Sequence, residues 1–263
     1  MKQDDLSYFK TFFFNYVEKF YSEDTTIQKN IILKRDHTLR VLKNMNIITE
    51  DLNLDQNSML IAETIALFHD IGRFYQFNKY KTFSDKDSEN HAELGVDILK
   101  SKKILNRLKD EEKDIIIKSI KYHNMYKLPI NESNQCILFS KLIRDADKID
   151  IYMVLTDYYK ELDSDLNPAL EHNLPKDESY SPLIIADILN LRNSNSKLIK
   201  TRYDMRLLTL TWIFDLNFKI SFKLIKNHDY INKTLKVLPN NEDMDEIKLL
   251  LTNYIENKIN FDS

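Results

Sequence analysis

Glycine is nearly absent from this chain of 263 residues, which has only Gly72, Gly95 and five prolines. Glycine-rich phosphate loops and the dinucleotide-binding fingerprint need more glycines than this, so both kinds of nucleotide site are excluded. So few glycines and prolines also leave little turn chemistry for β-hairpins. Leu, Ile, Lys, Glu and Asp recur at helical spacing instead, and this pattern predicts an all-α fold.

Other common features are scarce as well. Cys136 is the single cysteine, so no intrachain disulfide can form, which fits a reducing compartment. The chain opens without the charged and apolar regions of a signal peptide, and no apolar run approaches bilayer length. We therefore expect a cytoplasmic protein with no membrane partner. Its net charge of −3 gives no bulk attraction to duplex nucleic acid.

The chain is long enough, at 43% hydrophobic and 30% charged residues, to bury a substantial core. No internal repeat or low-complexity linker divides it. We expect one domain, with a motif-bearing core at about 28–162 and a helical extension at about 163–263. Periodic apolar residues predict helices at about 6–20, 28–45, 57–71, 89–99, 111–123, 136–162, 182–192, 201–226 and 241–259.

Histidine and aspartate form an ordered series that suggests a metal site. The pair His69-Asp70 ends an apolar helical stretch, and Gly72 is expected to end that helix. Burying such a pair without a metal or polar partners would be unfavourable. Taken alone, each histidine is more often a core or surface residue than a ligand. Four of the six histidines nevertheless belong to one series with two aspartates. Imidazole and carboxylate groups are the side chains that hold Mn, Fe or Zn. The candidate metal ligands are therefore His37, His69, Asp70, His91, His123 and Asp147.

The series resembles the HD-domain superfamily of metal-dependent phosphohydrolases over about residues 30–150. The pattern of that superfamily is matched by His37, His69-Asp70 and Asp147. Its HD-GYP members have a segment similar to His91-Ala-Glu-Leu-Gly95-Val-Asp-Ile98-Leu99 and a segment similar to His69-Asp-Ile-Gly-Arg73. Their paired histidines are matched only by Tyr122-His123-Asn124, and the Gly-Tyr-Pro element is absent. The chain therefore looks like a stand-alone bacterial HD hydrolase with a partial second-metal motif.

The resemblance implies an HD-domain helical bundle that holds one or two divalent transition metals. It places the first ion on His37, His69, Asp70 and Asp147, and the second on Asp70, His91 and His123. Asn124 or water would complete the shell of the second ion. Mn or Fe is favoured by these ligands, and Zn, Ni and Co remain open. Asp145 is the alternative to Asp147, because both carboxylates lie in Arg144-Asp145-Ala146-Asp147-Lys148.

The implied reaction is hydrolysis of a nucleotide phosphoester by metal-activated water, most simply a phosphodiesterase acting on a cyclic or short oligonucleotide. A nucleoside phosphate phosphatase, a non-catalytic nucleotide sensor and a diiron oxygenase are the alternatives. Asp70, Arg73 and Lys148 are the expected catalytic residues, the last two as cations for phosphate. A solvated helix charge is an equal reading for Lys148. The segment 74–88 is expected to be a loop whose aromatic side chains stack a base or pack the loop down: Phe74, Tyr75, Phe77, Tyr80 and Phe83.

Overall fold

The computed structural model describes residues 1–159, 174–175, 177 and 179–261. These residues form α-helices and short 3-10 helices joined by turns, and no strand occurs among them. The prediction of an all-α fold is therefore confirmed. Within the same ranges, no helix is both long enough and apolar enough to cross a membrane.

The chain divides into two compact units, Met1–Asp147 and Lys148–Ser263. The division falls inside helix α7, Asn134–Tyr158, and is earlier than the boundary near residue 162 that we predicted for the motif-bearing core. That predicted boundary lies outside the described residues. A single HD-type domain over the whole chain stays a prediction.

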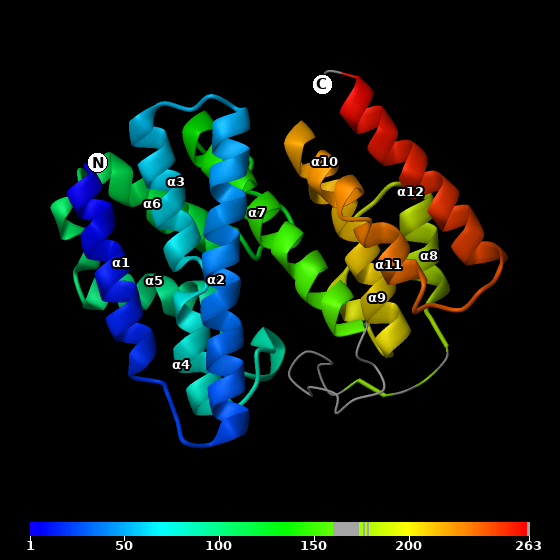
Figure 1. Cartoon of the computed structure of the whole chain (residues 1–263), viewed down its shortest axis with the longest axis horizontal. Helices are drawn as coiled ribbons and strands as arrows, with labels where there is room; N and C mark the ends of the chain where they lie inside the picture. Colours follow the sequence, from blue (N-terminus) through cyan, green and yellow to red (C-terminus); the bar gives the residue numbers. More distant parts are fainter. Residues whose placement is uncertain (160–173, 176, 178, 262–263) are drawn as a thin grey trace. The chain divides into compact units, whose positions relative to one another are not determined.

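The first unit is built around the long helix α2, with α3 and α4 packed along it (Figure 1). Helix α3 is buried on nearly every side, from Leu60 to Phe68, which makes it the central helix of this unit. Helix α1 covers it with aromatic rings, and Phe9 meets Phe68 edge to face at 5.7 Å. The α-helices of this unit that precede α7 are α1 Gln3–Glu18, α2 Thr25–Asp51, α3 Gln56–Phe68, α4 Ile71–Tyr80, α5 His91–Ser101 and α6 Asp110–Tyr122.

Gly72 does not end a helix, so that prediction was wrong. The break comes earlier, between Phe68 and Ile71, and Gly72 is the second residue of α4. Neither glycine has a positive φ. A Cβ on Gly72 would lie 2.1 Å from the carbonyl oxygen of His91 and 2.8 Å from the nitrogen of Gly95. The two glycines therefore let α4 and α5 cross closely, which brings the start of α5 against the start of α4.

Gly72→Ala is expected to destabilise the protein by about 1–3 kcal/mol or more, because the new methyl group would overlap backbone atoms that cannot rotate away. Gly95→Ala is the matched control, since its Cβ would approach a side-chain carbon of Ile71 at 3.3 Å. Urea unfolding of the two variants measures the difference. Equal stability of both variants would show that the crossing can widen freely.

The segment 74–80 is also different from the predicted loop, because α4 continues to Tyr80. Phe74 and Phe77 recur three residues apart and are buried, which is a helical pattern that we did not recognise in the polar surroundings. Phe77 stacks on Phe83 with ring centroids 4.7 Å apart. Packing is therefore the role of these three rings, whereas Tyr75 is exposed, at 39%, and Tyr80 is half-buried.

The second unit contains the later part of α7 followed by further helices. The helix predicted at 201–226 is interrupted by a 3-10 turn at Trp212–Asp215, although neither glycine nor proline marks this break. A short helix at Tyr230–Leu235 was not predicted. The α-helices of this unit after α7 are α8 Pro182–Leu189, α9 Arg202–Thr211, α10 Lys219–Asn227, α11 Tyr230–Leu235 and α12 Glu242–Asn260.

Candidate metal centre

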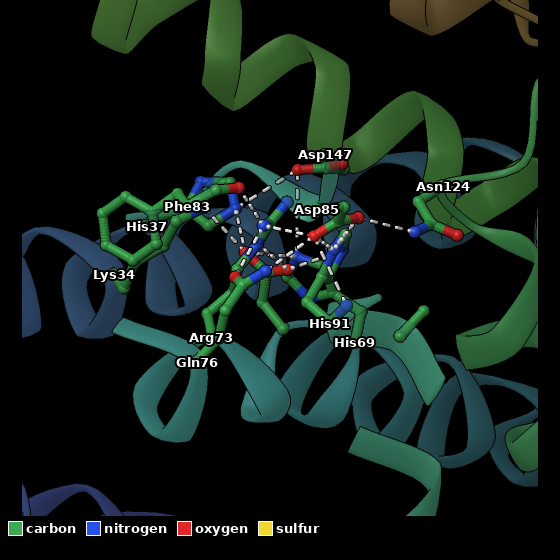
Figure 2. A network of polar contacts seen from close by, with 12 residues as sticks. Lys34, His37, His69, Arg73, Gln76, Phe83, Asp85, His91, Asn124 and Asp147 are labelled. Atoms are coloured by element: carbon green, nitrogen blue, oxygen red, sulfur yellow. Dashed lines mark hydrogen bonds and ion pairs between the residues drawn. The ribbon is translucent and has the colours of Figure 1, made fainter. Parts of the chain in front are cut away.

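The six predicted metal ligands come together in the first unit, although they lie on five different helices or helix ends. Figure 2 labels four of them: His37, His69, His91 and Asp147. His37 belongs to α2 and Asp147 to α7, while His69 and Asp70 occupy the junction of α3 and α4. His91 is the first residue of α5, and His123 directly follows α6. All except Asp147 are buried. Helix ends allow adjacent residues such as His69 and Asp70 to face one centre, which a continuous helix would prevent.

One group of donor atoms consists of His37, His69 and one oxygen of Asp70, with Asp147 beside them. The Nε2 atom of His37 lies 3.5 Å from Asp70 Oδ2 and 3.2 Å from Asp147 Oδ1. The Nε2 atom of His69 lies 3.8 Å from each of these oxygens. Two imidazoles and two carboxylates at these distances form a suitable set for a transition metal.

A second group uses the other oxygen of Asp70. His91 Nε2 lies 3.3 Å from Asp70 Oδ1, and His123 Nε2 lies 3.8 Å from the same atom. The two groups that could hold a metal, His37–His69–Asp70 and Asp70–His91–His123, therefore share one carboxylate. A carboxylate with one oxygen in each group is the arrangement that bridges two ions.

The orientation of the rings also fits metal ligands. His69 Nδ1 lies 2.8 Å from the carbonyl oxygen of Ala66, and His123 Nδ1 lies 2.6 Å from that of Ile120. A carbonyl only accepts, so each Nδ1 carries the proton and each Nε2 presents a lone pair. His69 Nε2 is buried and has no hydrogen-bond partner among the described residues. A metal ion would supply the missing partner.

The facing Nε2 atoms of His91 and His123 also fit a bound metal ion. Their Nε2 atoms lie 3.0 Å apart, while His91 Nδ1 lies 2.7 Å from a carboxylate oxygen of Asp85. In the neutral rings both protons are then on Nδ1, and the two Nε2 lone pairs face one another. Such a pair is repulsive unless a cation lies against both nitrogens.

Burial keeps these histidines neutral, the form that binds metals. It lowers the pKa of His69 and of His91. Burial, with the neighbouring rings of His91 and His69, lowers the pKa of His123 to about 3. Burial alone would raise the pKa of Asp70, but Lys34, His69 and Arg73 outweigh it and hold that pKa well below its usual range. The centre thus combines the neutral imidazoles of His69, His91 and His123 with the ionised carboxylate of Asp70.

Residues 35–152 match the family model of the HD domain. The chain carries an HD domain. The match includes all six candidate ligands, from His37 to Asp147, and confirms the resemblance seen in the sequence. HD domains are in general metal-dependent phosphohydrolases, and the two donor groups agree with that activity. A search of the curated proteins and a search of the solved structures each found no match.

Between the two aspartates considered near the end of the HD domain, the structure brings Asp147 against His37. Asp145 is buried two residues earlier on α7. Positions two apart on an α-helix point roughly 200° away from each other, so Asp145 does not face the same centre. Arg144, also buried, donates to the carbonyl oxygens of Tyr122, His123 and Met125. It therefore fixes the end of α6 that carries His123.

The two predicted catalytic cations of the HD domain, Arg73 and Lys148, pair with different carboxylates. Arg73 is close to the centre, with Nε 3.4 Å from Asp70 Oδ1 and Nη1 2.9 Å from Asp85 Oδ1. Lys148 is the first residue of the second unit, and its Nζ lies 2.7 Å from Asp215 Oδ2. The catalytic roles of Arg73 and Lys148 stay predictions.

Two residues that contact the candidate ligands, Lys34 and Asp85, were not predicted from the sequence. Lys34 Nζ lies 2.8 Å from Asp70 Oδ2, and its position one turn before His37 on a predicted helix was a usable signal. Asp85 contacts His91 and Arg73, but it lies in a polar connection that gave no signal. Asn124, which we considered for the second ion's shell, donates its amide to Asp85 and Asn90.

Proposed function

We propose that this protein hydrolyses a nucleotide phosphoester, and that it is a phosphodiesterase acting on a cyclic or short oligonucleotide. The observation that supports the proposal most is the sharing of Asp70 between two donor groups. Bound at such a pair of sites, divalent ions supply a water of lowered pKa and stabilise charge on the attacking and leaving oxygens.

The chain's own residues prepare the centre for an anionic substrate. Asp70 and Asp147 stay ionised, because neighbouring groups hold their pKa values down against the effect of burial: Lys34, His69 and Arg73 for Asp70, and His37 and His69 for Asp147. Lys34 contacts Oδ2 of Asp70, and Arg73 contacts Oδ1. Each carboxylate oxygen therefore has a positive charge beside it. Such fixed charges favour the extra negative charge that develops on a phosphoryl group in the transition state.

The choice of a diester rests on the second donor group. His91 begins the segment that resembles the HD-GYP phosphodiesterases, and its ring lies against Asp70 and His123. Ions at both groups would stabilise the attacking and leaving oxygens of a monoester as well as those of a diester. The resemblance of the His91 segment is therefore the feature that favours a phosphodiesterase over a nucleoside phosphate phosphatase.

The test is elemental analysis of the purified protein, followed by a hydrolysis screen with Mn²⁺ or Fe²⁺. The panel contains cyclic mononucleotides, cyclic dinucleotides, short oligonucleotides and nucleoside mono-, di- and triphosphates, and chromatography identifies each product. We expect diester cleavage that is lost in a His69→Ala variant. Release of inorganic phosphate from monoesters alone would establish the phosphatase instead. Binding without turnover, or a requirement for dioxygen, would contradict a hydrolase.

Lys34→Met is expected to lower the rate on the best substrate by about 10-fold or more while both ions stay bound, because it removes a cation beside Asp70 without removing a ligand. Lys34→Arg keeps the charge and should recover part of the rate. Lys10→Met is the control. Lys10 on α1 also forms an ion pair, with Nζ 3.1 Å from a carboxylate oxygen of Glu63, but that carboxylate belongs to neither donor group. Unchanged kinetics in Lys34→Met would assign this lysine to the stability of Asp70 alone.

A further inference from the structure

Asp85 lies on the connection between α4 and α5, in the short 3-10 helix Asp85–Asp87, and several donors converge on its carboxylate. His91 Nδ1 lies 2.7 Å from Oδ2 and 2.9 Å from Oδ1. Gln76 Nε2 donates to Oδ1 at 2.8 Å, and Arg73 Nη1 lies 2.9 Å from the same atom. Asn124 Nδ2 donates to Oδ2 at 3.2 Å. The carboxylate thus joins α4, α5 and the residue that follows His123.

A comparison with the other ligands shows why His91 needs such a partner. His69 and His123 lie at the ends of α3 and α6, and each ring uses a carbonyl oxygen three residues earlier in its own helix. His91 is the first residue of α5, so its helix contains no earlier carbonyl. Asp85 takes the place of that acceptor.

We propose that Asp85 is the positioning residue of the second metal ion, acting through His91. Its carboxylate fixes the proton on Nδ1 and turns Nε2 towards Asp70 Oδ1, 3.3 Å away, and His123 Nε2, 3.0 Å away. Its negative charge also makes the imidazole a stronger donor to a metal. The same carboxylate holds Arg73, whose Nε lies 3.4 Å from Asp70 Oδ1.

The anchoring of the segment supports this role. The side chain of Gln76 is buried and donates to Asp85, Ser88 and the carbonyl oxygen of Glu89. Phe83, two residues before Asp85, is buried against Phe77. The hydrogen bond from Gln76 and the packing of Phe83 both fix the position of the Asp85 carboxylate, so it is a rigid hydrogen-bond partner for His91.

The inference rests on the proposed two-ion centre, and metal binding tests it without a substrate. Metal-free wild type, Asp85→Ala and Asp85→Asn are titrated with Mn²⁺ by calorimetry, and elemental analysis gives the stoichiometry. In Asp85→Ala we expect an unchanged first site and a second site weakened by about 10–100-fold. Asp85→Asn keeps the size and an acceptor, so it should fold as wild type and weaken the second site less. Asp87→Asn, an exposed aspartate on the same 3-10 helix, is the matched control.

A double-mutant cycle separates positioning from general stability. We expect His91→Ala to lose the second ion, so the cycle is read at the first ion: if Asp85 acts through His91, adding Asp85→Ala should leave the affinity of the first ion unchanged. An additional loss in the double variant, equal weakening of both sites, or wild-type affinity in Asp85→Ala and Asp85→Asn would overturn the proposal. Wild type that binds only one ion would overturn the two-ion centre as well, which distinguishes that failure from a failure of Asp85 alone.

Discussion

Replacing Asp70 with alanine is expected to remove both metal ions and to lower hydrolysis by on the order of 10³-fold or more, beyond the loss of a single preorganised donor. Asp70 is the residue that the two donor groups have in common, with Oδ2 facing His37 and Oδ1 facing His91. Without it each group keeps its histidines but loses the carboxylate that joins them. Elemental analysis and the rate on the best substrate measure the two effects.

Asp70→Asn separates chemistry from folding, because the amide has the same size but a much weaker donor oxygen and no charge. It should retain the fold and still bind less metal at both sites. Asp97→Ala, an exposed aspartate on α5, should behave as wild type. Two ions at full occupancy in Asp70→Ala would refute the bridging role and leave two independent sites.

The clustering of the candidate ligands could be predicted from the sequence because metal binding restricts residue types strongly. His37, His69-Asp70 and Asp147 follow a fixed order, and five of the nine predicted helices each contribute one part of the set that also includes His91 and His123. Helical periodicity located the starts of these helices to within a few residues, but α2 continues to Asp51, six residues beyond its predicted end at Met45. The order of ligands along helices is a local property, and a sequence displays it directly.

The supporting contacts could not be predicted because they form between elements. Gly72 looked like a helix end, yet its function is to let α4 approach α5 at the carbonyl of His91. Asp85 lies six residues from His91 with no motif between them, and only the folded connection brings its carboxylate to Nδ1. The ion pair between Lys34 and Asp70 joins two helices, so it could be recognised only in the folded structure. A pattern of residue types does not specify such pairings across helices.

The interruption at Trp212–Asp215 in the second unit has a similar cause. Apolar residues continue at helical spacing through 201–226, so the periodicity predicted one helix. The chain nevertheless leaves the helix without glycine or proline, and Tyr152 of α7 donates a hydrogen bond to the carbonyl oxygen of Thr209 just before the break. Tertiary packing can override local propensity in this way.

His123→Ala is expected to empty the second site, leave the first ion bound and lower the rate by on the order of 10²-fold, the scale of losing one element of charge stabilisation. The Nε2 atom of His123 faces His91 and Asp70 Oδ1, whereas the first group is complete without it. Its Nδ1 bonds within its own helix end, to Ile120, and Arg144 still holds the backbone there. The fold should therefore survive the change.

His228→Ala provides the control for His123→Ala, because His228 is exposed in the second unit and belongs to neither donor group. It should retain both ions and the full rate. Calorimetric titration of the two metal-free variants with Mn²⁺ gives the occupancy of each site, and steady-state kinetics give the rate. If His123→Ala bound two ions with wild-type affinity, His123 would be a structural histidine, and the second ion would require a different set of ligands. If it lost both ions together, the two sites would form one cooperative centre rather than two groups that share a carboxylate.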